Sequence, residues 1–305
     1  PLTTHNSTLK LTIMLDLSHF EDHSIAIFGL GVSGAAIARA LQDAGVTVAC
    51  WDDVQHVRAS AGDLALVNLY DIDFTAFDYF VLAPGIPHSY PEPHTLARKA
   101  QAAGVPIISD VELMRRADSA KECIAITGTN GKSTTTALIG HLLQEDYPNA
   151  TGGNLAPAVG ELDPERGRYV LELSSFQLEL TATLKPVAAV LLNITPDHAD
   201  RYASFADYVA AKRRIFEDPP DTGTPLAVIG VDEPPCAAMA DDLRREGRWR
   251  VICVATKRRL DNGIYVENDS LVDNVDGREE IICDLPPGER LKGLHNAQNA
   301  AAAYA

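Results

Sequence analysis

Short apolar runs alternate with helical patterns along most of this chain, and no other feature of the sequence constrains the fold as strongly. From Ser24 an apolar run precedes a helical pattern and a second apolar run, and the same order begins again at Glu122. Strands that alternate with helices pair in parallel, with the helices packed on the faces of the sheet. The sequence therefore predicts an α/β fold that contains two largely parallel sheets.

A polar segment divides the chain between these two series. At 305 residues the chain is long enough for two ordinary hydrophobic cores. The segment ADSAK at 117–121 is polar and weakly periodic, which is typical of a joint. We predict an N-terminal extension at 1–23, a first domain at 24–118 and a second domain at 119–305.

The second domain has a strand pattern of its own. Doubly apolar segments such as AAVLLNI at 188–194 are typical of central strands in a parallel sheet, which are buried on both faces. Beyond about residue 260 the segments become shorter and more polar, and the turn sequence DNG occurs at 261–263. This change predicts antiparallel pairing near the end of the chain.

Charge and cysteine content exclude several kinds of partner. Lys plus Arg number 26 against 42 Asp plus Glu, so the formal net charge of −16 argues against a broad grip on nucleic acid or an anionic membrane. No uncharged apolar run approaches the roughly 18 residues that a membrane helix needs. The five cysteines are scattered without CxxC spacing, which argues against disulfides and zinc. We expect a cytoplasmic monomer without membrane or nucleic-acid partners.

The stretch AITGTNGKSTTTALIG at 125–140 predicts a phosphate-binding loop. A strand, a glycine loop and a helix start follow one another, so backbone N–H groups and a lysine can surround an anion, and the next hydroxyl can reach magnesium. The usual GxxxxGK[ST] pattern needs glycine where this chain has Ile126, so a glycine turn without a ligand is the alternative. The candidate residues are Gly128, Thr129, Asn130, Gly131, Lys132, Ser133 and Thr134.

Acidic residues are expected at the same edge of the sheet, because parallel strands open their ligand crevice at their carboxyl ends. Glu172 is the only charge in the apolar strand YVLELSS, and a buried carboxylate is costly unless it is paired or binds metal. Asp197, His198 and Asp200 follow the next apolar strand. The alternatives are an edge-strand glutamate that faces water, and aspartates that cap a loop beside an incidental histidine.

Lys212 lies on the apolar face of a predicted helix near 204–217, whereas Arg214 faces the opposite way. A lysine on a buried face must reach solvent, pair with an anion or lose its charge, and burial lowers its pKa. A neutral amine beside a metal site could be modified or act chemically. The apolar residues around Lys212 are Phe205, Tyr208, Val209, Ile215 and Phe216.

A second glycine turn opens the first domain, in IAIFGLGVSGAA at 25–36. Its GxGxxG pattern, with Asp52 after the next strand, is a Rossmann fingerprint for a dinucleotide. The pattern alone is weak, since another nucleotide phosphate or close helix packing can require the same glycines. The turn APGIPH at 83–88 adds a second loop at this edge. An NAD-dependent oxidoreductase and a non-catalytic nucleotide-binding module are both open readings here.

Five motifs, in this order and with similar spacing, resemble the Mur ligase family: GTNGKST, LELSSFQLE, NITPDHADRY, AAKRRIF and GLHNAQNAAAA. LELSSFQLE is most similar to the branch of the family that adds D-glutamate. The resemblance runs from about Ser24 to the last residue. It implies a Rossmann-like domain that binds a UDP-sugar and a central P-loop-type ATPase domain. It also implies an ATP-dependent amide ligase of peptidoglycan synthesis, which serves cell-wall biogenesis, cell shape and cell division.

The resemblance further implies substrates and residue roles. The carboxylate of UDP-N-acetylmuramoyl-L-alanine would take the γ-phosphoryl group of ATP, and the amine of D-glutamate would then attack this acyl phosphate. Lys132 would hold the ATP phosphates, and Asn296 and Asn299 would contact adenine. The catalytic residues would be Lys132, Glu172, His198 and Lys212. Mg²⁺ would be held by Ser133 or Thr134, by Glu172 and His198, and by Lys212 in its carbamylated form.

The resemblance also implies a third domain and a set of residues that bind the sugar nucleotide. Family members continue into a third domain that contacts ATP and the amino acid, and this sequence ends where that domain would begin. We therefore expect these 305 residues to bind the sugar nucleotide without forming the amide at a useful rate. The implied substrate-binding residues are Gly31, Val32, Ser33, Asp52, Pro84, Gly85 and Asn154.

Overall fold

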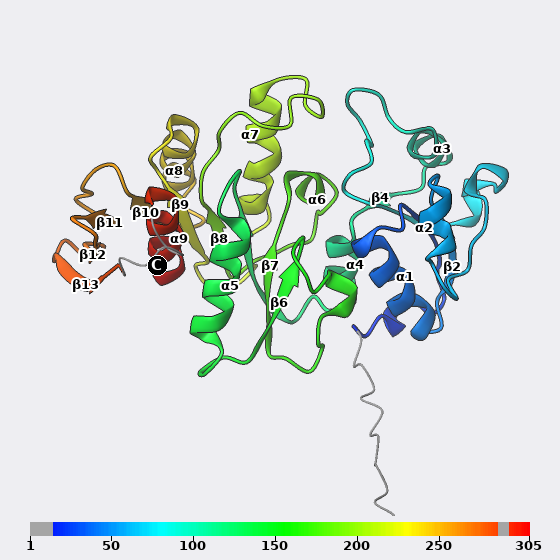
Figure 1. The fold of residues 1–305 in the computed structure, drawn as a ribbon, viewed down its shortest axis with the longest axis horizontal. Coiled ribbons are helices and arrows are strands. Elements are labelled where there is room, and N and C mark those ends of the chain that lie inside the picture. Colours follow the sequence, from blue (N-terminus) through cyan, green and yellow to red (C-terminus); the bar gives the residue numbers. More distant parts are fainter. Residues whose placement is uncertain (1–14, 286–292) are drawn as a thin grey trace, which may run out of the picture.

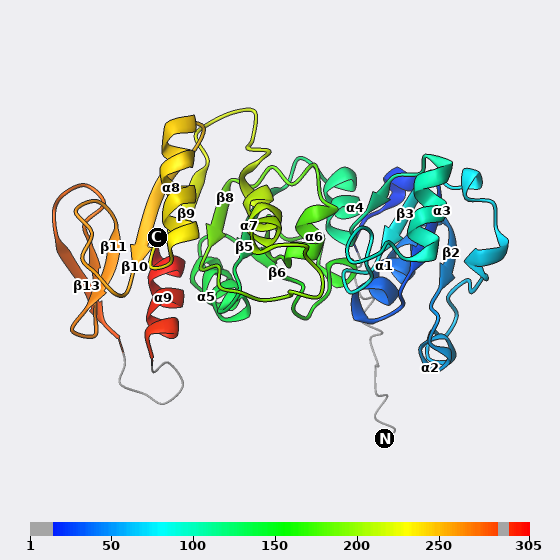
Figure 2. The ribbon, with the colours of Figure 1, turned by 90° about the horizontal axis from the view of Figure 1, so that it is seen from above.

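Two separate sheets organise the fold in this computed structural model, which describes residues 15–285 and 293–305 (Figure 1). The sheets lie side by side in an elongated molecule, as both views show (Figure 2). The predicted α/β class is confirmed. Most of the predicted extension at 1–23 lies outside the described residues, but Leu15, Leu17 and Phe20 are buried in the core.

The smaller sheet is parallel and contains β1 (Ser24–Phe28), β2 (Thr47–Trp51), β3 (Tyr79–Leu82) and β4 (Ile107–Ile108), in the order β2-β1-β3-β4. Its helices are α1 (Val32–Asp43), α2 (Gln55–Ala59) and α3 (Thr95–Ala103). Side chains along β1 alternate: Ile25 and Ile27 join one core cluster with α1, and Ala26 and Phe28 join another with α3. The sheet is therefore buried on both faces.

The larger sheet has the order β13-β12-β11-β10-β9-β8-β5-β7-β6. Its first six strands are β5 (Glu122–Thr127), β6 (Asn149–Gly153), β7 (Arg168–Glu172), β8 (Ala188–Leu191), β9 (Leu226–Gly230) and β10 (Arg250–Ala255), and they pair in parallel. The last three are β11 (Ile264–Glu267), β12 (Ser270–Asp273) and β13 (Glu280–Asp284). They pair antiparallel with one another, as the sequence predicts.

Helices cover both faces of the larger sheet. They are α5 (Lys132–Leu143), α6 (Ser175–Glu179), α7 (Phe205–Arg213), α8 (Pro234–Glu246) and α9 (Leu294–Tyr304), and they follow α4 (Asp110–Ala117) in the chain. Along β5, Ile124 and Ile126 share a cluster with α5 and α9, whereas Ala125 belongs to the cluster that includes α7 and α8. Strand β8 lies between β5 and β9, which confirms the central place predicted for its apolar segment.

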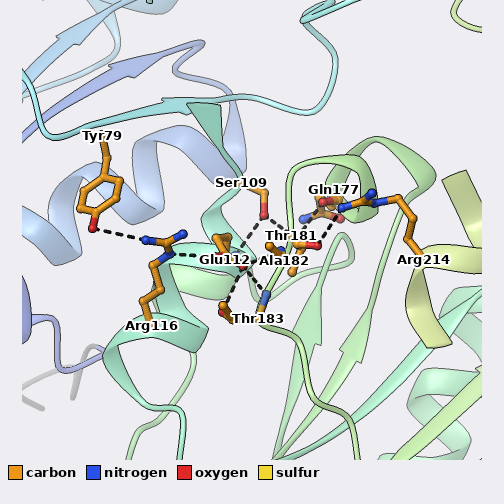
Figure 3. Close-up of polar contacts among 9 residues, drawn as sticks. All are labelled: Tyr79, Ser109, Glu112, Arg116, Gln177, Thr181, Ala182, Thr183 and Arg214. Atoms are coloured by element: carbon orange, nitrogen blue, oxygen red, sulfur yellow. Dashed lines mark hydrogen bonds and ion pairs between the residues drawn. The ribbon is translucent and has the colours of Figure 1, made fainter. Parts of the chain in front are cut away.

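Helix α4 fills the boundary between the sheets (Figures 1 and 2). The buried carboxylate of Glu112 on α4 accepts the backbone N–H groups of Ala182 at 2.7 Å and Thr183 at 2.9 Å, and the Nε–H of Arg116 at 2.7 Å (Figure 3). These charge-assisted bonds tie α4 to the segment that follows α6. We call this group of polar contacts at the boundary, made by Glu112, Arg116, Ala182 and Thr183, the polar seam.

Two absences bear on the sequence predictions. Within the described ranges, no helix combines the length and apolar character needed to cross a bilayer. All five cysteines carry free thiols, which agrees with the predicted lack of disulfides.

Candidate functional site

The phosphate-loop candidate joins the end of β5 to the start of α5. Lys132 is the first residue of α5, so the free N–H groups of the first helical turn point toward the loop. Gly131 has φ +88°, a left-handed conformation that favours glycine, and a Cβ there would collide with the side-chain amide of Asn299. Gly131 therefore allows the last helix to pack directly against the loop.

Two residues beyond the loop fix its shape. Asn193, just after β8, accepts from the backbone N–H of Asn130 at 2.9 Å and donates to the carbonyl oxygen of Asn130 at 3.1 Å. The hydroxyl of Thr129 accepts from the N–H of Thr195 at 3.1 Å. The loop is therefore preformed. Sequence reasoning missed this role of Asn193, because the pairing spans more than sixty residues and leaves no local signal.

Lys132 and Lys212 reach the same atom of this loop. The ammonium group of Lys132 donates to the carbonyl oxygens of Gly128 at 3.1 Å and Thr129 at 3.0 Å, and that of Lys212 donates to Gly128 at 2.8 Å. Burial lowers the pKa of Lys132, and burial together with the charge of Lys132 lowers the pKa of Lys212 to about 7. Both effects favour the neutral amine form of Lys212.

The helix that carries Lys212 corrects one detail of the sequence prediction. Lys212 is 2 % exposed, as its place in the apolar stripe predicts, and Tyr208 and Phe216 are also buried. Phe205 is 41 % exposed instead, because α7 begins there and its first turn projects beyond the core. Arg214 is half-buried, and its Nε–H donates to the carbonyl oxygen of Leu178 at 2.8 Å.

Glu172 ends β7 at the same edge and is 2 % exposed, which excludes a glutamate that faces water. Its carboxylate accepts from the Ser133 hydroxyl at 2.6 Å and from the Asn154 side-chain amide at 2.9 Å. Ser133 and Thr134 are both exposed on the first turn of α5, and it is Ser133 that bonds to Glu172. Ser133, Glu172 and Asn154 therefore meet at one point beside the phosphate loop.

A hydroxyl and a carboxylate at one point suit a magnesium ion, which prefers oxygen ligands and commonly takes one or two carboxylates together with water and substrate phosphates. Across the described ranges, no three His, Cys, Asp or Glu side chains gather closely enough to bind metal by themselves. A metal here would therefore need further oxygen ligands, such as those of nucleotide phosphates and water.

The segment after β8 presents Asp197 and His198 near this edge. His198 has φ +52°, a sparsely populated conformation for a residue other than glycine, and its Nε2 lies 3.6 Å from the Asp197 carboxylate. Its ring packs against Phe176 and Tyr208, with centroid distances of 4.9 and 5.8 Å. These contacts hold the imidazole beside α6 and α7. Asp200 is exposed.

A cleft of about 310 Å³ adjoins the phosphate loop. From α9, His295 and Gln298 line this cleft, whereas Asn299 turns to Gly131 and its side-chain amide donates to Asn296 at 3.3 Å. The amide oxygen of Asn299 is buried and has no hydrogen-bond partner among the described residues. Apart from Asn130, the residues that line this cleft were not anticipated from the sequence; the lining comprises Asn130, Asn193, Thr195, Asp232, Glu233, Thr256, Lys257, His295 and Gln298.

The glycine turn of the smaller sheet borders a second cleft, of about 400 Å³. Gly31 and Val32 line it, and Val32 is 74 % exposed. Ser33 and Asp52 are not in its lining: the Asp52 carboxylate accepts the backbone N–H groups of Leu30 at 2.7 Å and Val54 at 2.8 Å. Asp52 thus stabilises the backbone of the glycine turn through these two hydrogen bonds.

The turn at 83–88 packs beside that glycine turn. A Cβ on Gly29 would lie 2.6 Å from the Cβ of Ala83, so the two turns are in close contact. Pro84 is half-buried and Gly85 is exposed, and the carbonyl oxygen of Gly85 accepts from Arg201 at 2.7 Å. Arg201 belongs to the segment after β8, so this bond joins the two halves of the molecule.

Comparison with known proteins gives consistent results. The sequence profile of the Mur ligase middle domain matches residues 126–305. UDP-N-acetylmuramoylalanine–D-glutamate ligases from Paramagnetospirillum magneticum and Caulobacter vibrioides are 44 % and 43 % identical, over 96 % of this chain in both cases. The chain spans 64 % of the length of each of these relatives.

Solved structures show the same fold at lower sequence identity. The UDP-N-acetylmuramate:L-alanyl-γ-D-glutamyl-meso-diaminopimelate ligase from Neisseria meningitides is 18 % identical, with a TM-score of 0.59. The match covers 92 % of this chain and 91 % of that one. At this identity the likeness concerns the fold.

Proposed function

Because the chain belongs to the Mur ligase family, we propose that it catalyses the ATP-dependent joining of D-glutamate to UDP-N-acetylmuramoyl-L-alanine. The choice of D-glutamate is supported by the 44 % identity to ligases named for that reaction. The proposal places the protein in peptidoglycan synthesis, in the cytoplasm, where ATP is available. Since the chain spans 64 % of those relatives, the activity is proposed for the full-length protein.

One observation carries the proposal: a phosphate loop, a buried carboxylate and a buried amine meet at the carboxyl edge of one sheet. Lys132 and Lys212 share the Gly128 carbonyl oxygen, and Ser133 links the loop to Glu172. An NAD-dependent oxidoreductase would leave this arrangement without a role. A reaction that handles ATP and a carboxylate uses every part of it.

The proposed first step activates the substrate carboxylate. A carboxylate oxygen attacks the γ-phosphorus of ATP, the bond to the β-phosphate oxygen breaks, and ADP leaves. Lys132 would turn from its two carbonyl partners to the phosphates, which the N–H groups of α5 also face. Ser133 and Glu172 would hold Mg²⁺, which neutralises charge on the transferring phosphoryl group when bound.

In the second step the amine of D-glutamate attacks the carbonyl carbon of the acyl phosphate. A tetrahedral intermediate forms, the amine loses a proton, and phosphate departs with the former carboxylate oxygen. Asn154, fixed by its bond to Glu172, would lie against the substrate, and Asn296 and Asn299 would serve the nucleotide. His198 would face the second metal position from the β8 segment.

Lys212 would act in carbamylated form. Its neutral amine would attack CO₂, forming an N–C bond and releasing a proton, so that a buried cation becomes a carboxylate. Burial supports this reaction because it favours the neutral amine over the ammonium form. The product would supply a further carboxylate to a metal at Glu172.

The cleft at Gly31 and Val32 would receive the UDP moiety, with the turn at Pro84 and Gly85 beside it. The test is product analysis with the full-length protein, ATP, Mg²⁺ and UDP-N-acetylmuramoyl-L-alanine, with D-glutamate, L-glutamate or other amino acids in separate reactions. We expect a product heavier by one glutamyl residue with D-glutamate only, and one ADP for each amide. NADH turnover in place of ADP release would favour the oxidoreductase instead.

A further inference from the structure

Arg201 bridges three segments that are distant in sequence. It lies three residues beyond His198, and its Nη1–H donates to the carbonyl oxygen of Gly85 at 2.7 Å, 116 residues away. Its guanidinium lies 4.4 Å from the ring centroid of Phe176 on α6. One side chain therefore contacts the turn of the smaller sheet and the helix that follows Glu172.

The surroundings of Arg201 are unusual for a half-buried arginine. Within the part of the chain that the structure describes, no carboxylate lies within ion-pair distance of its guanidinium, and its Nε is buried without a hydrogen-bond partner. The negative charges of Glu179 and Asp200 act on the guanidinium from beyond ion-pair distance. The contact partners of this partly desolvated cation are one carbonyl oxygen and one aromatic face, and they come from two different parts of the molecule.

We propose that Arg201 is a positioning residue: it holds the turn at 83–88 against the segment that carries His198. This inference rests on the proposed function, in which that turn contacts the sugar nucleotide and His198 belongs to the reaction centre. The bond to Gly85 fixes the distance between the turn at 83–88 and the segment that carries His198. The substrate carboxylate is then held in line with the phosphoryl group of ATP. Small errors in such alignment cost large factors in rate.

The experiment compares Arg201→Gln and Arg201→Lys with Arg258→Gln in the full-length protein. Arg258 is a matched control, because it also donates to a backbone carbonyl, that of Val231 at 3.2 Å, but this bond joins the loops that follow β10 and β9 of the larger sheet. Hydrogen exchange of the peptide covering 83–88 is measured without substrates. The kcat, the KM for the sugar nucleotide and the KM for ATP are then measured by ADP release.

We expect faster exchange at 83–88 in Arg201→Gln only, and a fall in kcat/KM for the sugar nucleotide of roughly tenfold to a hundredfold. The KM for ATP should not change, and Arg201→Lys should recover part of the loss through its single ammonium donor. Unchanged exchange in both Arg201 variants would overturn the proposal, as would a lowered melting temperature with unchanged kcat/KM. If the wild type does not ligate, the proposed function fails while the exchange result still decides the role of Arg201.

Discussion

Lys132 and Lys212 donate to the same carbonyl oxygen, that of Gly128, at 3.1 and 2.8 Å. Two ammonium groups on one acceptor repel each other, and the more buried one has its pKa lowered to about 7, first by burial and then by the charge of its neighbour. The two lysines therefore suit different roles. Lys132 is a candidate phosphate ligand, and Lys212 is a candidate nucleophile toward CO₂.

Replacing Lys132 should remove phosphoryl transfer and spare the other substrate. We expect Lys132→Ala to lower kcat about 10²- to 10³-fold, since it removes a charged donor from the transferring group. Binding of the sugar nucleotide, measured by calorimetry, should remain near the wild-type value, because the cleft proposed for it lies at the smaller sheet. Lys185→Ala, at an exposed lysine, is the control. Equal loss of both properties would indicate misfolding.

Lys212 should carry a carbamate in bicarbonate buffer. With ¹³C-labelled bicarbonate at about pH 8, above the lowered pKa, the neutral amine can form an N–¹³C bond. We expect a carbamate resonance in the wild-type protein that disappears in Lys212→Ala and persists in Lys257→Ala, an exposed-lysine control. A spectrum without that resonance in the wild type contradicts the assignment.

The same lysine predicts a pH dependence of stability in CO₂-free buffer. The folded pKa is about 7 and the ordinary value is 10.5, so between these limits the unfolded chain binds a proton that the folded chain lacks. The free energy of unfolding should therefore rise with pH over this window. Lys212→Met should flatten the rise in denaturant titrations taken at several pH values. Parallel curves for wild type and variant would refute the lowered pKa.

The polar seam should contribute measurably to stability. Glu112→Gln removes the charge that accepts from Ala182, Thr183 and Arg116, and places an amide N–H₂ where donors already converge. We expect a loss of about 1–3 kcal/mol in the free energy of unfolding. The exposed Glu92, which pairs with Arg98, provides the control Glu92→Gln, for which a much smaller change is expected. Similar losses in both variants would argue against the seam.

The parts of the site that could be predicted each leave a local signature. The phosphate loop shows glycines and a lysine between a strand and a helix, and Lys212 interrupts an apolar stripe at helical spacing. Glu172 is a lone charge in an apolar strand. Those three signals also place the residues at one sheet edge, where the structure finds them.

Other parts depend on contacts between distant segments. Asn193 and Arg201 act through partners 63 and 116 residues away, so nothing in their neighbours reveals the pairing. Strand β6 has the sequence NATGG and is a strand because β7 pairs with it, against its own propensity. Helix α4 could have been found, since Ser109 three residues before Glu112 is a capping signature, and its hydroxyl accepts from the Glu112 N–H at 3.0 Å.

The central claim is that this edge converts a carboxylate into an acyl phosphate, and an oxygen label tests it most directly. UDP-N-acetylmuramoyl-L-alanine with ¹⁸O in its terminal carboxylate is incubated with the full-length protein, ATP, Mg²⁺ and D-glutamate, and the released phosphate is examined by ³¹P NMR. The account predicts one ¹⁸O atom in the phosphate for each amide formed. Amide formation accompanied by unlabelled phosphate would contradict it.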